Sequence, residues 1–119
     1  MPITLEDLYA HPKFVEKVER PIKAKIMSWK FPPGNPSAAA PAGVTLNNVN
    51  FSDEDEERIQ GEVVVSSRVS VNATVTTTED TTQTFEGHMN FSLPWGWQGR
   101  DTRFVAESAQ VVLNDLRLP

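Results

Sequence analysis

The strongest constraint on the fold is the stretch of residues 59–93, in which apolar and polar residues alternate along two runs. A period of two places successive side chains on opposite faces of a β-strand, so each run predicts a strand with one dry face and one wet face. The polar residues 78–81 separate the runs and are typical of a connection between antiparallel neighbours. We therefore expect a long β-hairpin. Its predicted dry face consists of Val63, Val65, Val69, Val71, Ala73, Val75, Phe85, Gly87, Met89, Phe91 and Leu93.

The length of the chain, 119 residues, predicts a single domain over residues 1–119. Cysteine is absent, which excludes disulfides, thiolate metal ligands and a cysteine nucleophile. No apolar run approaches the roughly 18 residues of a membrane-spanning helix, and the first residues have neither the basic start nor the apolar core of a secretory signal. We expect a soluble, cytoplasmic protein that does not associate with membranes.

The charge is acidic and unevenly distributed. The chain has a net charge of −5, with +2 in residues 1–30 and −7 in residues 31–119. Phosphate neutralisation by Lys and Arg dominates nucleic-acid binding, so an acidic sheet domain is a poor partner for nucleic acid. The sequence therefore disfavours a nucleic-acid partner.

The N-terminal residues predict helix. Thr4 can cap a helix, and Asp7 three positions later completes the capping-box pattern. Pro12 suits the first turn of a second helix. Pro21 leaves two interpretations, because proline inside a helix costs about 3 kcal/mol. Either one amphipathic helix continues past Pro21, or the helical segment ends near residue 20 and a strand follows over residues 22–31. We favour the strand.

The rest of the chain predicts an antiparallel meander over residues 44–118. Residues 32–43 are rich in proline and alanine and predict a loop, and residues 44–51 predict a strand. Residues 52–57 predict a turn, or one helical turn capped by Ser52, and residues 102–118 predict a final strand. The expected fold is therefore α+β, with an N-terminal helical segment packed on four or five strands. With helical material covering one face of the meander, this order of elements resembles the cystatin-like and NTF2-like groups of folds.

The sharpest candidate for a contact site is the loop containing Trp95 and Trp97, with Arg100 beside it. Exposed aromatic and arginine side chains often dominate the energetics of protein interfaces. Two simpler interpretations remain: at least one ring can close the open end of the core, and Arg100 can pair with the neighbouring Asp101. Our first hypothesis is a small non-enzymatic binding or interaction protein, with an accessory, inhibitor or assembly role and a protein partner.

The second hypothesis is a pocket that binds or converts a small apolar molecule. His88 and Glu86 share the wet face of the hairpin and would be its acid–base pair, because a His beside a carboxylate can act as a general base. Trp29, Phe91 and Trp95 would be its walls. No nucleophile-elbow motif is present, so the sequence favours a non-enzymatic protein.

No cofactor or metal site is expected. The chain has two distant histidines, and the acidic residues 53–57 lack the spacing and the glycine of a calcium loop. We interpret this acidic run as a solvated surface. The wet face of the hairpin, or an edge strand, is compatible with homo-oligomerisation.

Overall fold

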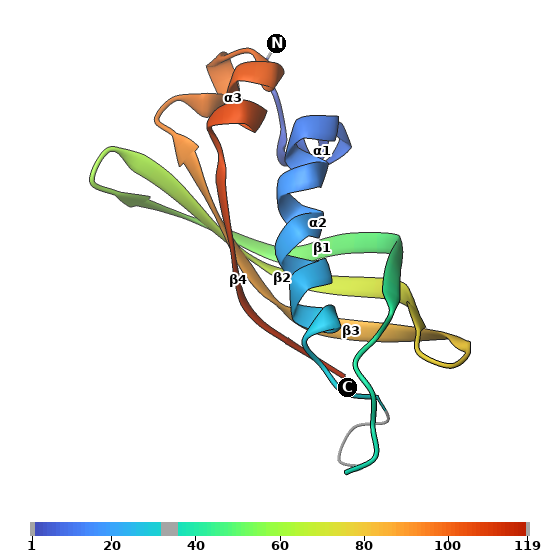
Figure 1. Cartoon of the computed structure of the whole chain (residues 1–119). Helices are drawn as coiled ribbons and strands as arrows, with labels where there is room; N and C mark the ends of the chain where they lie inside the picture. The colour runs from blue at the N-terminus through green and yellow to red at the C-terminus, as the bar shows by residue number, and fades with distance from the viewer. Residues whose placement is uncertain (1, 32–35, 119) are drawn as a thin grey trace.

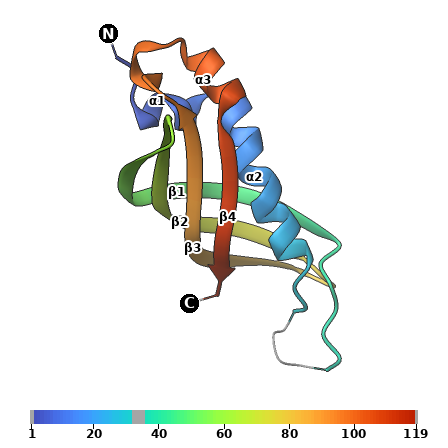
Figure 2. The same ribbon diagram turned by 90° about the vertical axis from the view of Figure 1, so that its left-hand side faces the viewer.

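The computed structural model describes residues 2–31 and 36–118. Four antiparallel strands form one sheet in the order β1-β2-β3-β4, and helix α2 lies across one face of it (Figures 1 and 2). The short helices α1 and α3 lie together at one end. The α+β meander predicted from the sequence is confirmed. In chain order the elements are α1 (Leu5–Ala10), α2 (Pro12–Met27), β1 (Gly43–Ile59), β2 (Glu62–Thr76), β3 (Asp80–Pro94), the 3-10 turn η1 (Trp97–Gly99), α3 (Thr102–Ser108) and β4 (Gln110–Arg117).

The predicted hairpin is confirmed as β2 and β3. The two strands pair without a register shift, from Glu62 opposite Pro94 to Thr76 opposite Asp80. The predicted dry-face residues are all buried, and they form the core together with α2. The valine, phenylalanine, methionine and leucine side chains of this set each hide apolar surface worth about 1.5–3 kcal/mol, which fixes the register because a shift by one residue would expose the whole set.

The start of the helical region follows the sequence pattern. Thr4 and Asp7 form the complete capping box of α1, and His11 caps α2 by accepting a hydrogen bond from the Lys13 amide at Nδ1. Pro12 occupies the first turn of α2. Both helix starts were therefore predictable from local chemistry.

The preference for a strand after residue 21 was wrong, because α2 continues through Pro21 to Met27. Phe14, Val18, Ile22 and Ile26 are buried at helical spacing along one side of α2. The proline costs about 3 kcal/mol in a helix interior. Burial of Ile22 and Ile26, at about 1.5–3 kcal/mol each, offsets that cost.

The predicted turn over residues 52–57 was also wrong, since β1 continues through the acidic run to Ile59. A register shift between Ser52 and Asp55 admits the extra residues as a bulge, with Asp53 at a φ of 53°. All of these acidic side chains are exposed, and an edge strand tolerates charged residues and bulges. The turn lies at Gln60 and Gly61, whose φ angles of 49° and 81° are both positive, as in a type I′ hairpin.

The final strand predicted over residues 102–118 is partly helix. Asp101 caps α3 by accepting a hydrogen bond from the Arg103 amide at 2.8 Å, and Val105 and Ala106 are buried. Only Gln110–Arg117 forms the strand β4. A short helix forms here because Asp101 next to it supplies the cap, and because Val105 and Ala106 cover the end of the core.

The loop predicted over residues 32–43 is confirmed only in part. Residues 32–35 lie outside the described residues, and β1 begins at Gly43. Phe31 and Ala39 form an isolated bridge that closes the segment between α2 and β1. In the described part of the chain, no helix combines the length and apolar character needed to cross a membrane.

Candidate binding surface at the Trp95 loop

The two tryptophans of the β3–α3 loop lie in different environments. Trp97 is 2% exposed and belongs to the core, whereas Trp95 is 51% exposed. Gly96 separates them with a φ of 70°, a left-handed conformation that glycine adopts without a steric penalty. Trp97 therefore closes the end of the core, as the alternative interpretation of this loop proposed, and does not contribute exposed contact area. Trp95 does.

Arg58 covers one side of Trp95. Its guanidinium carbon lies 4.5 Å from the centroid of the indole ring, within the range of a cation–π contact. Arg58 reaches the ring from β1, just before the turn at Gln60 and Gly61, and faces Val63 across the ladder. A cavity of about 270 Å³ opens beside this pair. Its walls are Glu56, Arg58, Val63, Trp95, Gly96, Trp97 and Gln98.

Arg100 extends the same surface. Its Nε donates a hydrogen bond to the carbonyl oxygen of Trp95 at 3.3 Å, and its guanidinium carbon lies 5.3 Å from the ring centroid of Phe104. Phe104 is 46% exposed. Arg58, Trp95, Arg100 and Phe104 are thus linked in series, and we call these four residues the arginine–aromatic patch.

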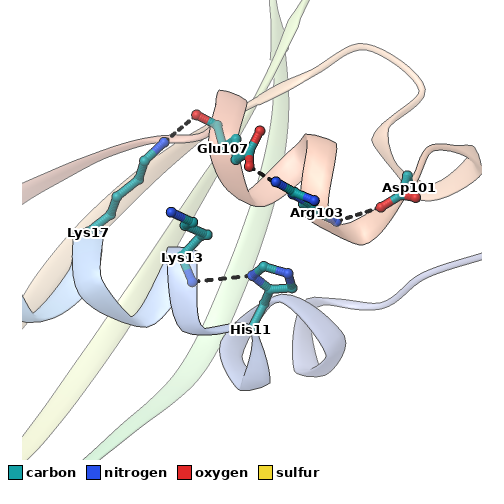
Figure 3. Close-up of polar contacts among 6 residues, drawn as sticks. All are labelled: His11, Lys13, Lys17, Asp101, Arg103 and Glu107. Carbon is teal, nitrogen blue, oxygen red and sulfur yellow. Dashed lines mark hydrogen bonds and ion pairs between the residues drawn. The ribbon is translucent and has the colours of Figure 1, made fainter.

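The α3 side of the patch is fixed to the rest of the fold by hydrogen bonds (Figure 3). Lys17 reaches from α2 and donates from Nζ to the carbonyl oxygens of Glu107 at 2.5 Å and Ala109 at 2.7 Å. These carbonyls lie at the C-terminal end of α3, which favours a cation. Arg103 binds Glu107 at 3.0 Å within the helix, and Asp101 caps its start. Asp101 therefore caps α3 and does not form an ion pair with Arg100.

The two arginines of the patch differ from their neighbour Arg103 in electrostatics. Within residues 2–31 and 36–118, neither Arg58 nor Arg100 forms an ion pair with a carboxylate, although Arg103 pairs with Glu107. A stacked guanidinium still presents its N–H groups in the plane of the group. The patch therefore combines exposed aromatic area with hydrogen-bond donors that bear positive charge.

His88 and Glu86 are not assembled into the pocket of the second hypothesis. His88 lies on the outer face of the sheet, away from α2, and its side chain is 49% exposed. Phe91 is buried on the inner face. Trp29 packs there against Phe85, with 5.2 Å between the ring centroids. The required walls and the acid–base pair therefore lie on opposite faces.

The carboxylate that contacts His88 is Asp115 of β4, with 2.9 Å between His88 Nδ1 and Asp115 Oδ1. This hydrogen bond lowers the pKa of Asp115 below its ordinary value of 3.8. Sequence reasoning missed the pair, because a register shift next to His88 determines which residue of β4 lies opposite. No local pattern in the sequence reports that shift.

A second cavity, of about 230 Å³, lies between α2 and the edge strand β1. Tyr9 forms part of its wall and stacks on Phe51 at 4.4 Å, and its hydroxyl donates to Glu54 Oε1 at 3.3 Å. Burial, reinforced by the charge of Glu54, raises the pKa of Tyr9 well above its ordinary value. Tyr9 is thus a neutral hydrogen-bond donor at the rim of an apolar groove.

Metal-ligating side chains are not clustered in the described part of the chain, where no group of three or more His, Asp or Glu side chains is placed to hold a metal ion. Comparisons with protein-family models, with curated proteins and with solved structures gave no match to this chain.

Proposed function

We propose that this chain is a small non-enzymatic binding protein that contacts a partner protein through the arginine–aromatic patch. The observation that supports this most directly is the serial arrangement of two exposed rings and two stacked guanidiniums at one end of the fold. Tryptophan and arginine are enriched among the residues that dominate binding energy at protein interfaces. The buried Trp97 and the contacts of Lys17 hold the patch in place, which limits the entropy lost on binding.

The absence of cysteine supports a cytoplasmic location as part of the same proposal, because such a chain needs no oxidising compartment to fold. The apolar groove beside α2 does not support a small-molecule function equally well. Its volume of about 230 Å³ is below the roughly 300–1,000 Å³ of typical ligand pockets. A hollow of about 510 Å³ beside His88 is large enough, but its lining consists of polar and charged residues alone, whereas ligand pockets are lined mainly by apolar side chains.

The test is affinity capture from the lysate of the native host, read by mass spectrometry. The double variant Trp95→Ala/Phe104→Ala removes both exposed rings of the patch. Val112→Ala is the matched control, because Val112 is an exposed apolar residue (57% exposed) on β4 that lies outside the patch. All three proteins are checked by circular dichroism before capture.

We expect a protein that is retained by the wild type and by the Val112 control but lost by the double variant. Retention of the same proteins by all three baits would contradict the proposal, as would the absence of any retained protein.

A further inference from the structure

The arginine–aromatic patch also indicates what its partner carries. Arg20, Arg68 and Arg103 each have a carboxylate within ion-pair distance, at 3.2, 3.8 and 3.0 Å. Arg58, Arg100 and Arg117 have none in the described part of the chain, although the sequence contains 16 Asp and Glu residues, and of these three only Arg58 and Arg100 lie over aromatic rings. Glu56 lines the cavity beside Arg58 but is not within ion-pair distance of it, so both guanidiniums of the patch keep N–H donors for a carboxylate of a partner.

Both guanidiniums are already oriented. Arg58 is held over the ring of Trp95, and Arg100 is held by the Trp95 carbonyl and the ring of Phe104. Stacking occupies the face of a guanidinium and leaves its edge for acceptors such as a carboxylate, which can bind in a bidentate manner. Among the residues that the structure describes, the guanidinium of Arg58 forms no hydrogen bond, so its N–H groups are available to a partner.

We infer that the patch binds an acidic segment of the partner protein, in which Asp or Glu pairs with Arg58 and Arg100 while an adjacent apolar side chain covers Trp95 and Phe104. This inference rests on the proposed function and specifies the chemistry of the partner. Charge complementarity supports it, because the guanidiniums of Arg58 and Arg100 attract a carboxylate, whereas the net charge of −7 over residues 31–119 repels an acidic segment from the rest of the sheet region. Such a distribution favours one binding orientation.

A nucleic acid does not fit the same site. Its phosphates carry about one charge per 1.7 Å of duplex, so a bound strand would extend over the acidic surface around the patch. A peptide segment with one or two carboxylates is short enough to pair with the two arginines while covering much less of that acidic surface. The acidic residues 53–57 and Glu62 lie close to the patch along β1 and β2.

The experiment selects peptides from a random display library on immobilised wild-type protein, with the Trp95→Ala/Phe104→Ala variant for counter-selection. We expect the enriched peptides to carry Asp or Glu next to an aromatic or aliphatic residue. The best peptide is then synthesised and its dissociation constant is measured by calorimetry at low and at high salt.

The variants Arg58→Gln and Arg100→Gln remove the positive charge and the forked arrangement of N–H donors of the guanidinium. Each is expected to weaken binding about tenfold, the equivalent of one charge-assisted hydrogen bond. Arg58→Lys keeps the charge but loses the planar edge, and should bind with intermediate affinity. Arg103→Gln is the matched control, because Arg103 lies in α3 beside the patch and is already paired with Glu107. Its effect should stay within about twofold, as expected for screened charges at the surface.

Three outcomes would overturn the inference. Enriched peptides that need Trp95 but are neutral or basic leave the proposed function intact and refute the acidic partner. Acidic peptides whose affinity is the same for wild type, Arg58→Gln and Arg100→Gln refute the assigned pairing. A selection without any peptide that depends on the patch refutes both the inference and the proposed function.

Discussion

The opposite roles of the two loop tryptophans lead to a quantitative prediction for the pair of variants Trp97→Ala and Trp95→Ala. A fully buried aromatic side chain hides about 150–250 Å² from water, which at about 25 cal/mol per Å² corresponds to ~4–6 kcal/mol. Trp97 is 2% exposed, and replacement of such a ring by alanine leaves a cavity. We therefore expect Trp97→Ala to lower the free energy of unfolding by about 3–5 kcal/mol.

Trp95 hides only half as much surface, because it is 51% exposed, and its removal leaves no enclosed cavity. The loss of stacking with Arg58 adds about 0.5–1 kcal/mol. Half of the value expected for Trp97→Ala is about 1.5–2.5 kcal/mol, so with the lost stacking we expect Trp95→Ala to cost about 2–3.5 kcal/mol in total. Urea unfolding followed by far-ultraviolet circular dichroism measures both values without depending on the fluorescence of the mutated rings. Equal destabilisation by the two variants, or a smaller effect of Trp97→Ala, would refute the assignment of Trp97 to the core and Trp95 to the surface.

Two further predictions concern β4 and the groove. An alanine at Gly87 would place its Cβ 2.0 Å from the Asp115 carbonyl oxygen, so Gly87→Ala should cost at least ~2 kcal/mol and increase hydrogen exchange in β4. Gly43→Ala, where nothing lies within 4 Å, is the control, and an equal effect would contradict this reasoning. Burial raises the pKa of Tyr9 above its ordinary value of 10.0, so stability should be complete below that pH and fall above it. Tyr9 is the single tyrosine, and we expect its phenolate absorbance to appear together with unfolding; a phenolate transition at the ordinary pKa in a folded chain would disprove the assignment.

Local patterns predicted the elements that local energies determine. The hairpin of β2 and β3 follows from alternation over many residues, and the cap of α1 follows from Thr4 and Asp7. In both cases the same residues specify the element and satisfy its hydrogen bonds. Agreement between local preference and overall fold is what makes a segment predictable.

The elements that were predicted wrongly depend on contacts between distant segments. Helix α2 continues past Pro21 because Ile22 and Ile26 are buried against the sheet, and this burial outweighs the local cost of the proline. The acidic part of β1 is a strand because β2 supplies its ladder partners. Helix α3 has apolar residues that fit a strand as well as a helix, and its position is fixed by Lys17 of α2.

The candidate site was likewise predictable only where its residues are close together in sequence. Trp95 and Arg100 are close in sequence, and a loop of this composition indicates a contact surface. Arg58 is distant from Trp95 in sequence, and the sequence does not indicate that it belongs to the site. Its contact with the indole ring becomes visible only in the folded chain, where β1 pairs with β2. Phe104 was placed in a strand by its sequence, and its position beside Arg100 requires the α3 helix.

The arrangement of the loop explains why a buried and an exposed tryptophan occur so close together. The left-handed turn at Gly96 sends the two rings in different directions, so that Trp97 anchors the loop in the core while Trp95 stays at the surface. An exposed ring on a mobile loop would lose conformational entropy on binding. Here the anchor, the stacking of Arg58 and the hydrogen bond of Arg100 restrict Trp95 before any partner arrives. Trp97 is therefore expected to contribute to binding through the position of Trp95, without touching the partner itself.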